Sequence, residues 1–297
     1  MNIMAPLLIA LAVSAPPIAP TITASSAQAV VPHCQVLLIK DVDVSADDAG
    51  RLVDVSVAAG AAVQAGALVA KLDDRAAVLD KLAAELERDA AQARADDDIE
   101  VRYAVKSFEL ADAELAQDLE INQRAPGTVP TSEIRRKQLA RHRADLQIDR
   151  SRLDLKVAQM TADVQNAAVQ AAEEKIARRR LLAPFDGFVV QVYRQANEWV
   201  NAGEPVLRVV QMDRLHVDGF ISGADYAVSE IANHPVTVEV ELARGRKEQF
   251  TGRVVFVNPI VQAGNRYRVR AEVKNRQEAK QWLLNPGSTA TMVIHLQ

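Results

Sequence analysis

Two short stretches, GRLVDV at residues 50–55 and GFVVQV at residues 187–192, carry the same strand-like pattern. The match continues without a gap after both of them, at a constant offset along the chain. Glycine or asparagine stands at the turns that follow, and both residue types adopt positive φ at low cost. The chain therefore contains an internal repeat, which must be explained before any other feature. Its matching turn positions are Gly50, Gly60 and Gly66 in one copy, and Gly187, Asn197 and Gly203 in the other.

A helical hairpin is predicted between the two copies. No proline or glycine occurs from Arg75 to about Gln123, and a second such run extends from Thr131 to just before Pro184. Two helices of nearly equal length around a short turn are expected to pair as an antiparallel coiled coil, each arm reaching about 70 Å. Thr131 or Ser132 is the expected cap of the second helix.

Apolar residues at spacings of three and four predict the seam between these helices. The run Asp96-Asp97-Asp98 interrupts the first stripe, so we expect poor packing or a shift of register there. The expected seam residues are Leu79, Leu82, Leu86, Ala93, Val101, Ala104, Phe108, Ala111 and Leu115, and then Leu139, His142, Leu146, Leu153, Val157, Met160, Val164, Ala167 and Ala171.

Alternating apolar runs dominate the rest of the chain. Residues 36–44 are predicted as one strand before the first repeat copy. One short helix is expected at residues 226–231. Five strands and one helix in so short a segment indicate a small closed barrel. The five expected strands are residues 215–220, 236–242, 250–257, 267–273 and 289–296.

The N-terminus resembles an export signal. Residues 3–13 form an apolar run of signal-peptide length, and Ala27-Gln28-Ala29 is an A-x-A cleavage pattern. No lysine or arginine precedes the run, which departs from the usual pattern. Cys34 raises the alternative of lipid attachment, but the residues before it are not small, and we interpret it as a half-buried apolar residue.

Composition excludes several classes of function. The net charge of −4 gives no indication of nucleic-acid binding. A single cysteine excludes a multi-cysteine zinc site, and the five histidines show no metal-ligand spacing. His142 is interpreted as a packed or partly exposed residue on the seam rather than a ligand. We expect no metal, no cofactor and no catalytic set.

The ordered set of motifs resembles a known family. The two glycine-punctuated copies look like the halves of a lipoyl or biotinyl domain. The version divided by a helical hairpin is similar to the periplasmic adaptor subunits, or membrane fusion proteins, of the HlyD type. Ala183-Pro184-Phe185-Asp186-Gly187 resembles that family's APFDG entry to the second half, and Asn285-Pro286-Gly287 resembles its turn before the last barrel strand.

This resemblance implies an elongated fold of mixed α and β class: a split lipoyl-like β-sandwich, a long antiparallel coiled-coil hairpin and a small C-terminal β-barrel. The expected parts are a signal peptide at residues 1–29, the first half of the lipoyl-like domain at 30–74, the hairpin at 75–181 with its tip at about 124–132, the second half at 182–210, and the barrel at 211–297.

A lipoyl or biotinyl carrier needs an acceptor lysine where the first half closes. The lipoyl pattern Asp-Lys-Ala is Asp74-Arg75-Ala76 in this chain. A guanidinium stays protonated and cannot take the place of that lysine as the acylated amine. Arg75 therefore argues against a bound lipoyl or biotinyl group.

Two places are candidates for partner contacts. By the resemblance, adaptors that dock on an outer-membrane channel carry an arginine, a leucine and a serine around the hairpin tip. The match is partial, because Pro130 stands where the family places the serine. Trp199 is a candidate contact between neighbouring subunits, although a cap over the sandwich core is the interpretation we favour. The candidate docking residues at the tip are Leu119, Arg124, Thr128, Thr131 and Ser132.

The function implied by the resemblance is that of a non-enzymatic periplasmic adaptor in a tripartite efflux or secretion system. It implies a homo-oligomer that links an inner-membrane transporter, of the RND or ABC type, to an outer-membrane channel. The chain would be exported, with its N-terminus either cleaved or retained as an anchor at the inner membrane. Two alternatives remain: a lipoyl- or biotinyl-type carrier subunit, and a structural coiled-coil protein of the envelope without a transporter.

Overall fold

A computed structural model of the protein describes residues 28–279 and 281–296. The described chain divides into two compact units, one running from Lys40 to Met212 and the other joining the residues up to Ile39 with those from Asp213 onward. The predicted signal peptide lies outside the described residues except for Gln28 and Ala29, which begin a strand. Within the described residues, no helix is long and apolar enough to cross a membrane.

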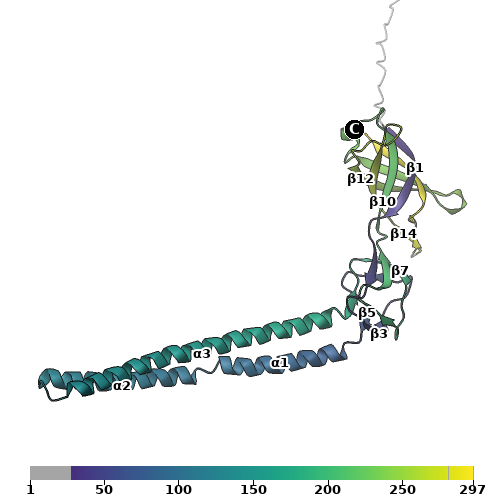
Figure 1. Ribbon diagram of the computed structural model, residues 1–297. Coiled ribbons are helices and arrows are strands. Elements are labelled where there is room, and N and C mark those ends of the chain that lie inside the picture. The colour runs from purple at the N-terminus through teal and green to yellow at the C-terminus, as the bar shows by residue number, and fades with distance from the viewer. Residues whose placement is uncertain (1–27, 280, 297) are drawn as a thin grey trace, which may run out of the picture. The chain divides into compact units, whose positions relative to one another are not determined.

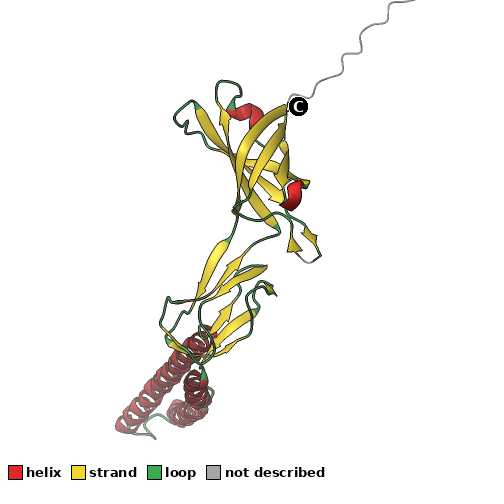
Figure 2. Ribbon diagram, turned by 90° about the vertical axis from the view of Figure 1, so that its right-hand side faces the viewer, coloured by secondary structure: helices red, strands yellow, loops and turns green. Residues whose placement is uncertain are grey.

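A sandwich of two four-stranded sheets organises the unit Lys40–Met212 (Figure 2). Each sheet takes strands from both repeat copies, so neither copy is a sheet on its own. One sheet has the order β2 (Asp41–Ser45), β9 (Pro205–Val210), β7 (Gly187–Val192) and β4 (Ala62–Val63), and the other has β6 (Arg180–Leu182), β5 (Leu68–Leu72), β3 (Gly50–Val55) and β8 (Trp199–Val200).

The hairpin leaves this sandwich between β5 and β6. Its outgoing arm is divided into α1 (Arg75–Ala95) and α2 (Ile99–Arg124), and its returning arm is the single helix α3 (Thr131–Ala177) (Figure 1). The break between α1 and α2 falls at Asp96-Asp97-Asp98, where the sequence predicted an interruption. With 47 residues, α3 is about 70 Å long. The predicted hairpin range ends slightly late, because β6 already begins at Arg180.

The seam prediction is confirmed for α2 and wrong for α1 and α3. Leu79, Leu86, Leu153 and Val164 are each at least 60% exposed, and His142 is exposed as well. Alanine at the true seam lets the helices approach closely, so the buried faces contain few leucines. These faces, buried or half-buried, carry Ala77, Ala84, Ala91 and Ala95 in α1, and Ile134, Ile148, Ser151, Leu155, Ala162, Val169 and Ala172 in α3.

The start of α3 also differs from the prediction. Neither Thr131 nor Ser132 caps the helix, since Pro130 precedes its first residue and no side chain makes a capping hydrogen bond. The carbonyl of Pro130 instead accepts hydrogen bonds from the N–H groups of Glu133 and Ile134. Proline keeps φ near −60°, which suits the entry to a helix.

A closed six-stranded barrel forms the other unit. The five strands predicted after Val210 are all present, with α4 (Val228–Ile231) close to the predicted helix. The interior is apolar, centred on fully buried side chains such as Leu215, Val238 and Met292. Around the barrel the order is β1 (Gln28–Leu38), β10 (Arg214–Ser222), β13 (Arg266–Lys274), β12 (Lys247–Val257), β11 (Pro235–Glu241) and β16 (Thr289–His295), while η1 (Ala243–Gly245) and the pair β14 (Gln277–Glu278) and β15 (Gln281–Trp282) lie in connections.

The sixth strand corrects the predicted domain scheme. Residues 30–38 belong to the barrel, not to the first half of the lipoyl-like domain, because β1 closes the gap between β10 and β16. The single strand predicted at residues 36–44 is two strands, β1 and β2, separated at Ile39-Lys40. Cys34 is fully buried inside the barrel rather than half-buried.

Candidate functional site

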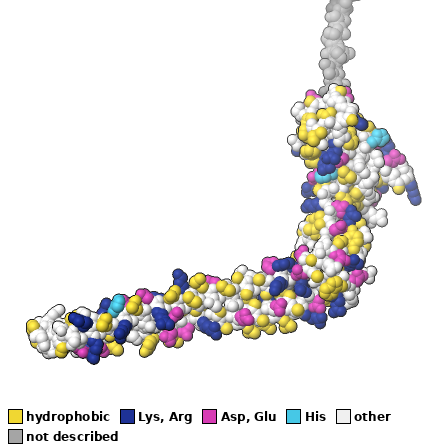
Figure 3. All heavy atoms as spheres, in the orientation of Figure 1, with side chains coloured by type: hydrophobic (Ala, Val, Ile, Leu, Met, Phe, Trp, Pro, Cys, Tyr) yellow, Lys and Arg dark blue, Asp and Glu magenta, His cyan; other side chains and the backbone are white. Residues whose placement is uncertain are grey.

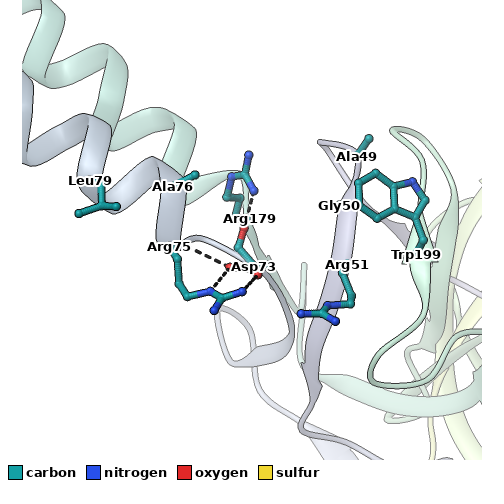
Figure 4. Close-up of a pocket in the computed structure, with 9 residues that line it drawn as sticks. All are labelled: Ala49, Gly50, Arg51, Asp73, Arg75, Ala76, Leu79, Arg179 and Trp199. Carbon is teal, nitrogen blue, oxygen red and sulfur yellow. Dashed lines mark hydrogen bonds and ion pairs between the residues drawn. The ribbon is translucent and has the colours of Figure 1, made fainter.

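The sandwich end of the hairpin holds the position of the missing acceptor lysine. Arg75 is the first residue of α1, and its Nε and Nη2 donate to the carboxylate of Asp73 at 3.0 and 2.6 Å (Figure 4). These bonds hold the pKa of the Asp73 carboxyl well below its ordinary value and raise the pKa of Arg75. The side chain is 79% exposed and permanently cationic. It offers no amine for acylation.

A pocket of about 800 Å³ opens beside Arg75. Arg179 reaches back into it from the end of α3 and donates through Nη1 to the carbonyl of Asp73. Trp199 is the register partner of Arg51 in the paired strands β3 and β8, and both residues line the pocket. The lining is completed by small and apolar residues, which in Figure 4 surround the space between the hairpin and the sandwich: Ala49, Gly50, Ala76 and Leu79.

Trp199 does not cap the sandwich core, which was the interpretation favoured from the sequence. The indole is 65% exposed and is absent from the core of the sandwich. An exposed tryptophan beside arginines is a composition often found where proteins bind partners. The sequence analysis did not select Arg179, which lies in the basic run Arg178-Arg179-Arg180. The signal in the sequence that could have indicated Arg179 is the position of this run, between the predicted second helix and the second repeat copy.

The five candidate docking residues all lie around the hairpin tip. Leu119 is 38% exposed near the end of α2. Arg124, at the last position of α2, forms an ion pair with Glu120. The Thr128 hydroxyl donates to the carbonyl of Ala125 at 2.8 Å. Thr131 and Ser132 are exposed in the first turn of α3.

Asn122 holds the tip loop in place, and the sequence analysis missed it. Its side-chain oxygen accepts from the N–H of Val129 at 3.0 Å, and its side-chain nitrogen donates to the carbonyl of the same residue at 3.1 Å. This pair of bonds joins α2 to the loop before α3. The docking candidates are therefore displayed on a structured turn, in which Gly127 takes φ of 87°.

The repeat turns have the geometry that glycine and asparagine allow. Gly60 and Asn197, which occupy equivalent positions, have φ of 93° and 74°. Gly66 and Gly203 are equivalent in the same way, with φ of 77° and 81°. Gly187 has a different role, since an added Cβ would lie 2.7 Å from the carbonyl oxygen of Val210. Gly50 has more room, with Leu72 as its nearest neighbour at 3.8 Å.

The described residues contain no group of three or more histidine, cysteine, aspartate or glutamate side chains that could hold a metal ion. Burial raises the pKa of the Cys34 thiol to about 11, so the sulfur stays protonated and is a poor nucleophile at neutral pH. Burial also lowers the pKa of His216, which lies on the barrel. Both groups belong to the barrel, whereas the pocket and the hairpin tip belong to the unit Lys40–Met212.

Comparison with known proteins identifies the barrel and the fold. Residues 227–297 match the model of the CusB-like β-barrel domain family. An uncharacterized protein of Haemophilus influenzae is 29% identical over 111 residues, which are 37% of this chain and 28% of that protein. The match thus spans less than a third of the relative's length.

Solved structures of membrane fusion proteins share the arrangement. MacA from Actinobacillus actinomycetemcomitans has a TM-score of 0.62 at 18% identity, with 91% of this chain and 78% of that chain covered. The membrane fusion protein Spr0693 from Streptococcus pneumoniae R6 has a TM-score of 0.55 at 15% identity, with coverages of 92% and 100%. A MacA–MexA chimeric protein with the Pseudomonas aeruginosa MexA α-hairpin domain has 0.51 at 17%, with coverages of 91% and 82%.

The chain therefore has the fold of the membrane fusion proteins, the periplasmic adaptors, as the sequence motifs predicted. Within that fold, residues 227–297 of the barrel are similar to the CusB-like β-barrel domain.

Proposed function

We propose that the protein is a non-enzymatic periplasmic adaptor that connects an inner-membrane transporter with an outer-membrane channel. The observation that carries the proposal is the hairpin itself. A 47-residue helix pairs along its length with α1 and α2, although the sandwich core needs none of these residues. A stiff arm of about 70 Å provides reach rather than a chemical site.

The outer end of the arm supports docking on a channel. Arg124, Thr128, Thr131 and Ser132 lie together on the turn that Asn122 stabilises. Hydroxyl and guanidinium groups on such a turn suit hydrogen bonding to the rim of another protein. By analogy with the fold, we propose two further points. The partner in the inner membrane is a transporter of RND or ABC type, and the chain is exported to the cell envelope.

The outer face of α3 supports assembly of several copies. A second apolar stripe with heptad spacing runs along this helix, away from the seam, and hydrophobic side chains are visible along the hairpin surface (Figure 3). Exposed stripes of this kind mark protein contacts. Trp199 and the arginines beside it offer a second contact near the sandwich. The stripe residues, each more than half exposed, are Leu139, Leu146, Leu153, Val157, Met160 and Val164.

The two alternative functions have weaker support. A lipoyl- or biotinyl-type carrier would need an acylated lysine where Arg75 forms its bidentate pair with Asp73. Intact-mass measurement of the purified chain should show no lipoyl or biotinyl adduct. A structural coiled-coil protein without a transporter would explain the arm but would leave the docking residues at its tip without a role.

Arm length can be changed without changing the seam. The ion pair between Arg141 and Asp112 aligns the two arms. Deleting residues 108–114 together with residues 140–146 removes one heptad from each side and keeps the register. We expect the shortened chain to fold and to lose transport in cells that lack the native copy. Unchanged transport would contradict the proposal.

Photo-crosslinking identifies the partner at the tip. A crosslinking residue at Thr128 should capture an outer-membrane channel in the native envelope. The same residue at Arg143, an exposed position on α3 away from the tip, is the matched control and should capture no channel. Recovery of no channel from Thr128 would favour the structural alternative.

A further inference from the structure

One end of the barrel is set apart by where the chain enters and leaves it. β1 begins at Gln28, which pairs with His295 of β16. At the same end β10 finishes at Ser222, opposite Arg266 at the start of β13. Both connections to the unit Lys40–Met212 leave from the other end, where β1 finishes and β10 begins. We refer to the first of these as the Gln28 end.

A structured loop presents two aliphatic side chains at the Gln28 end. It connects β12 to β13, and its Asn258 side chain accepts a hydrogen bond from the N–H of Ile260 at 3.0 Å. The N–H of Gln262 donates to the carbonyl of Arg266 at 2.7 Å and closes the loop. Ile260 and Val261 are nevertheless 70% and 55% exposed. Both side chains are therefore exposed although hydrogen bonds fix the conformation of the loop.

An aromatic ring and two arginines adjoin this loop. Phe220, on the outer face of β10, is 45% exposed, and the guanidinium of Arg266 lies over its ring at 5.9 Å. Arg268 is next on the same face of β13, but Asp218, the carboxylate nearest to it, is already bound by both nitrogens of Arg270. We define the end patch as Phe220, Ile260, Val261, Arg266 and Arg268.

The end patch itself contains two arginines and no acidic residue. Among the described residues, Arg266 has no carboxylate partner. Two acidic residues belong to the same end of the barrel, Asp225 and Glu230. Glu230 accepts a hydrogen bond from the N–H of Ala227, so its carboxylate is partly satisfied within its own turn. Apolar side chains beside Arg266, and beside Arg268 with its single long ion pair to Asp218 at 3.9 Å, match an interface that is apolar below an anionic layer.

The sequence before β1 indicates which interface this is. Residues 3–13 are an apolar run, and only residues 14–27 separate it from Gln28. Those residues can span at most about 50 Å. A membrane that holds the apolar run, before cleavage or as a lasting anchor, therefore lies within that distance of the Gln28 end. The end patch and Gln28, which the apolar run precedes in the sequence, lie at the same end of the barrel.

We infer that the end patch docks on an anionic phospholipid bilayer, with Ile260 and Val261 inserted at the level of the head groups and Arg266 and Arg268 bound to lipid phosphates. The inference does not rest on the proposed adaptor function, since it concerns the barrel and lipid alone. It gives the barrel a membrane contact that requires no transporter.

A tryptophan at the loop tip reports insertion directly. The full chain with Ile260→Trp is mixed with vesicles of phosphatidylcholine, with or without phosphatidylglycerol, and with brominated lipid as a quencher. The signal of the unsubstituted chain, from Trp199 and Trp282, is subtracted. We expect the added emission to shift to shorter wavelength and to be quenched, most strongly with phosphatidylglycerol. Ala243→Trp, in the exposed η1 turn at the opposite end of the barrel, should show neither change.

Binding variants test the two parts of the patch separately. Ile260→Glu together with Val261→Glu should weaken vesicle binding at least about tenfold, because two aliphatic side chains are lost from the contact. Arg266→Glu should weaken binding to vesicles with phosphatidylglycerol several-fold and leave binding to phosphatidylcholine alone unchanged. All variants keep the same N-terminal residues, so the differences report the patch.

The inference is overturned if Ile260→Trp behaves like Ala243→Trp while circular dichroism shows an intact fold. A crosslinker at Ile260 that captures a membrane protein, with the tryptophan unquenched in vesicles, would also overturn it. That outcome would assign the patch to a protein partner instead of lipid.

Discussion

The N–H of Gly60 donates to the carbonyl of Val189 at 2.8 Å, across the boundary between the two repeat copies. The equivalent bond in the other direction joins the N–H of Asn197 to the carbonyl of Leu52, also at 2.8 Å. Each copy thus completes the other, and the sandwich forms only when both are present. This explains how the chain tolerates a long hairpin between them. The reciprocal bonds hold the two copies together, and the pairing of β5 with β6 keeps the two ends of the insertion side by side.

The first prediction concerns the paired turns. Gly60→Asn should destabilise the protein by less than about 1 kcal/mol. Asparagine adopts positive φ, and a Cβ atom added at Gly60 would have no non-neighbouring atom within 4 Å. Gly60→Val should cost about 2 kcal/mol more, because a β-branched residue is strained at φ of 93°. Thermal unfolding followed by circular dichroism measures both. Equal destabilisation by the two variants would show that space, not φ, limits the site.

These turns also explain why the sandwich could be predicted from the sequence. Gly60, Gly66, Asn197 and Gly203 act locally, each through its own φ, so their spacing survives in the sequence as a repeat. Barrel closure is different, because β1 pairs with β16 at the other end of the chain. No local pattern distinguishes a strand that closes a barrel from one that starts a sandwich, and residues 30–38 were accordingly misassigned.

The prediction of the seam residues in α1 and α3 was wrong for another physical reason. α3 carries two stripes with heptad spacing, and the larger side chains, such as Leu153 and Met160, lie on the exposed one. Apolar periodicity detects a stripe but not its partner. Among the candidate site residues, the tip positions followed from the break in the helices. Asn122 and Arg179 instead act through side-chain bonds to backbone, in the first case across the tip loop and in the second across the whole hairpin, and no apolar spacing encodes such bonds.

The second prediction separates the two stripes. Ala162 packs against Ala91 and Ala95 and is 3% exposed, so Ala162→Leu should overpack the seam and cost about 1–3 kcal/mol. Leu153→Ala, at a position 60% exposed, should change the stability of the monomer by no more than about 0.5 kcal/mol. Thermal unfolding at low protein concentration provides the test. A larger loss of stability from Leu153→Ala than from Ala162→Leu would support the seam first predicted from the sequence.

The same exposed stripe predicts a concentration effect. If α3 contacts a second copy through Leu146, Leu153 and Val164, a triple substitution of these residues by serine should reduce self-association while leaving helix content unchanged. Sedimentation velocity over a range of concentrations measures the first quantity and circular dichroism the second. The same substitution at Leu79, Leu82 and Leu86 of α1 shows whether the outgoing arm takes part.

The barrel interior supplies the next prediction. A Cβ on Gly219 would lie 2.4 Å from the sulfur of Cys34 and 2.7 Å from a methyl carbon of Val31. Gly219→Ala should therefore cost about 1–3 kcal/mol, and adding Cys34→Ala should recover part of the loss by removing the sulfur. Gly252→Ala is the matched control, because its Cβ would meet the backbone carbonyl of Glu272 at 2.2 Å and Cys34→Ala cannot relieve that contact. Equal recovery in both backgrounds would contradict the packing argument.

The last prediction concerns the alkaline stability of the barrel. Burial raises the pKa of the Cys34 thiol from 9.0 to about 11, and the hydrogen bond from its sulfur to the carbonyl of Val31 is made by the protonated form. Below pH 9 the thiol is neutral whether the chain is folded or unfolded. Between pH 9 and 11 the thiol ionises first in the unfolded chain, so the free energy of unfolding should fall with rising pH, by on the order of 2 kcal/mol from this group.

Lysine and tyrosine side chains titrate in the same range, and Cys34→Ala keeps their contribution while removing that of the thiol. The difference in slope between the two proteins in denaturant unfolding at pH 8, 9, 10 and 11 isolates the cysteine, and parallel slopes would mean that the sulfur ionises as readily inside the barrel as outside it.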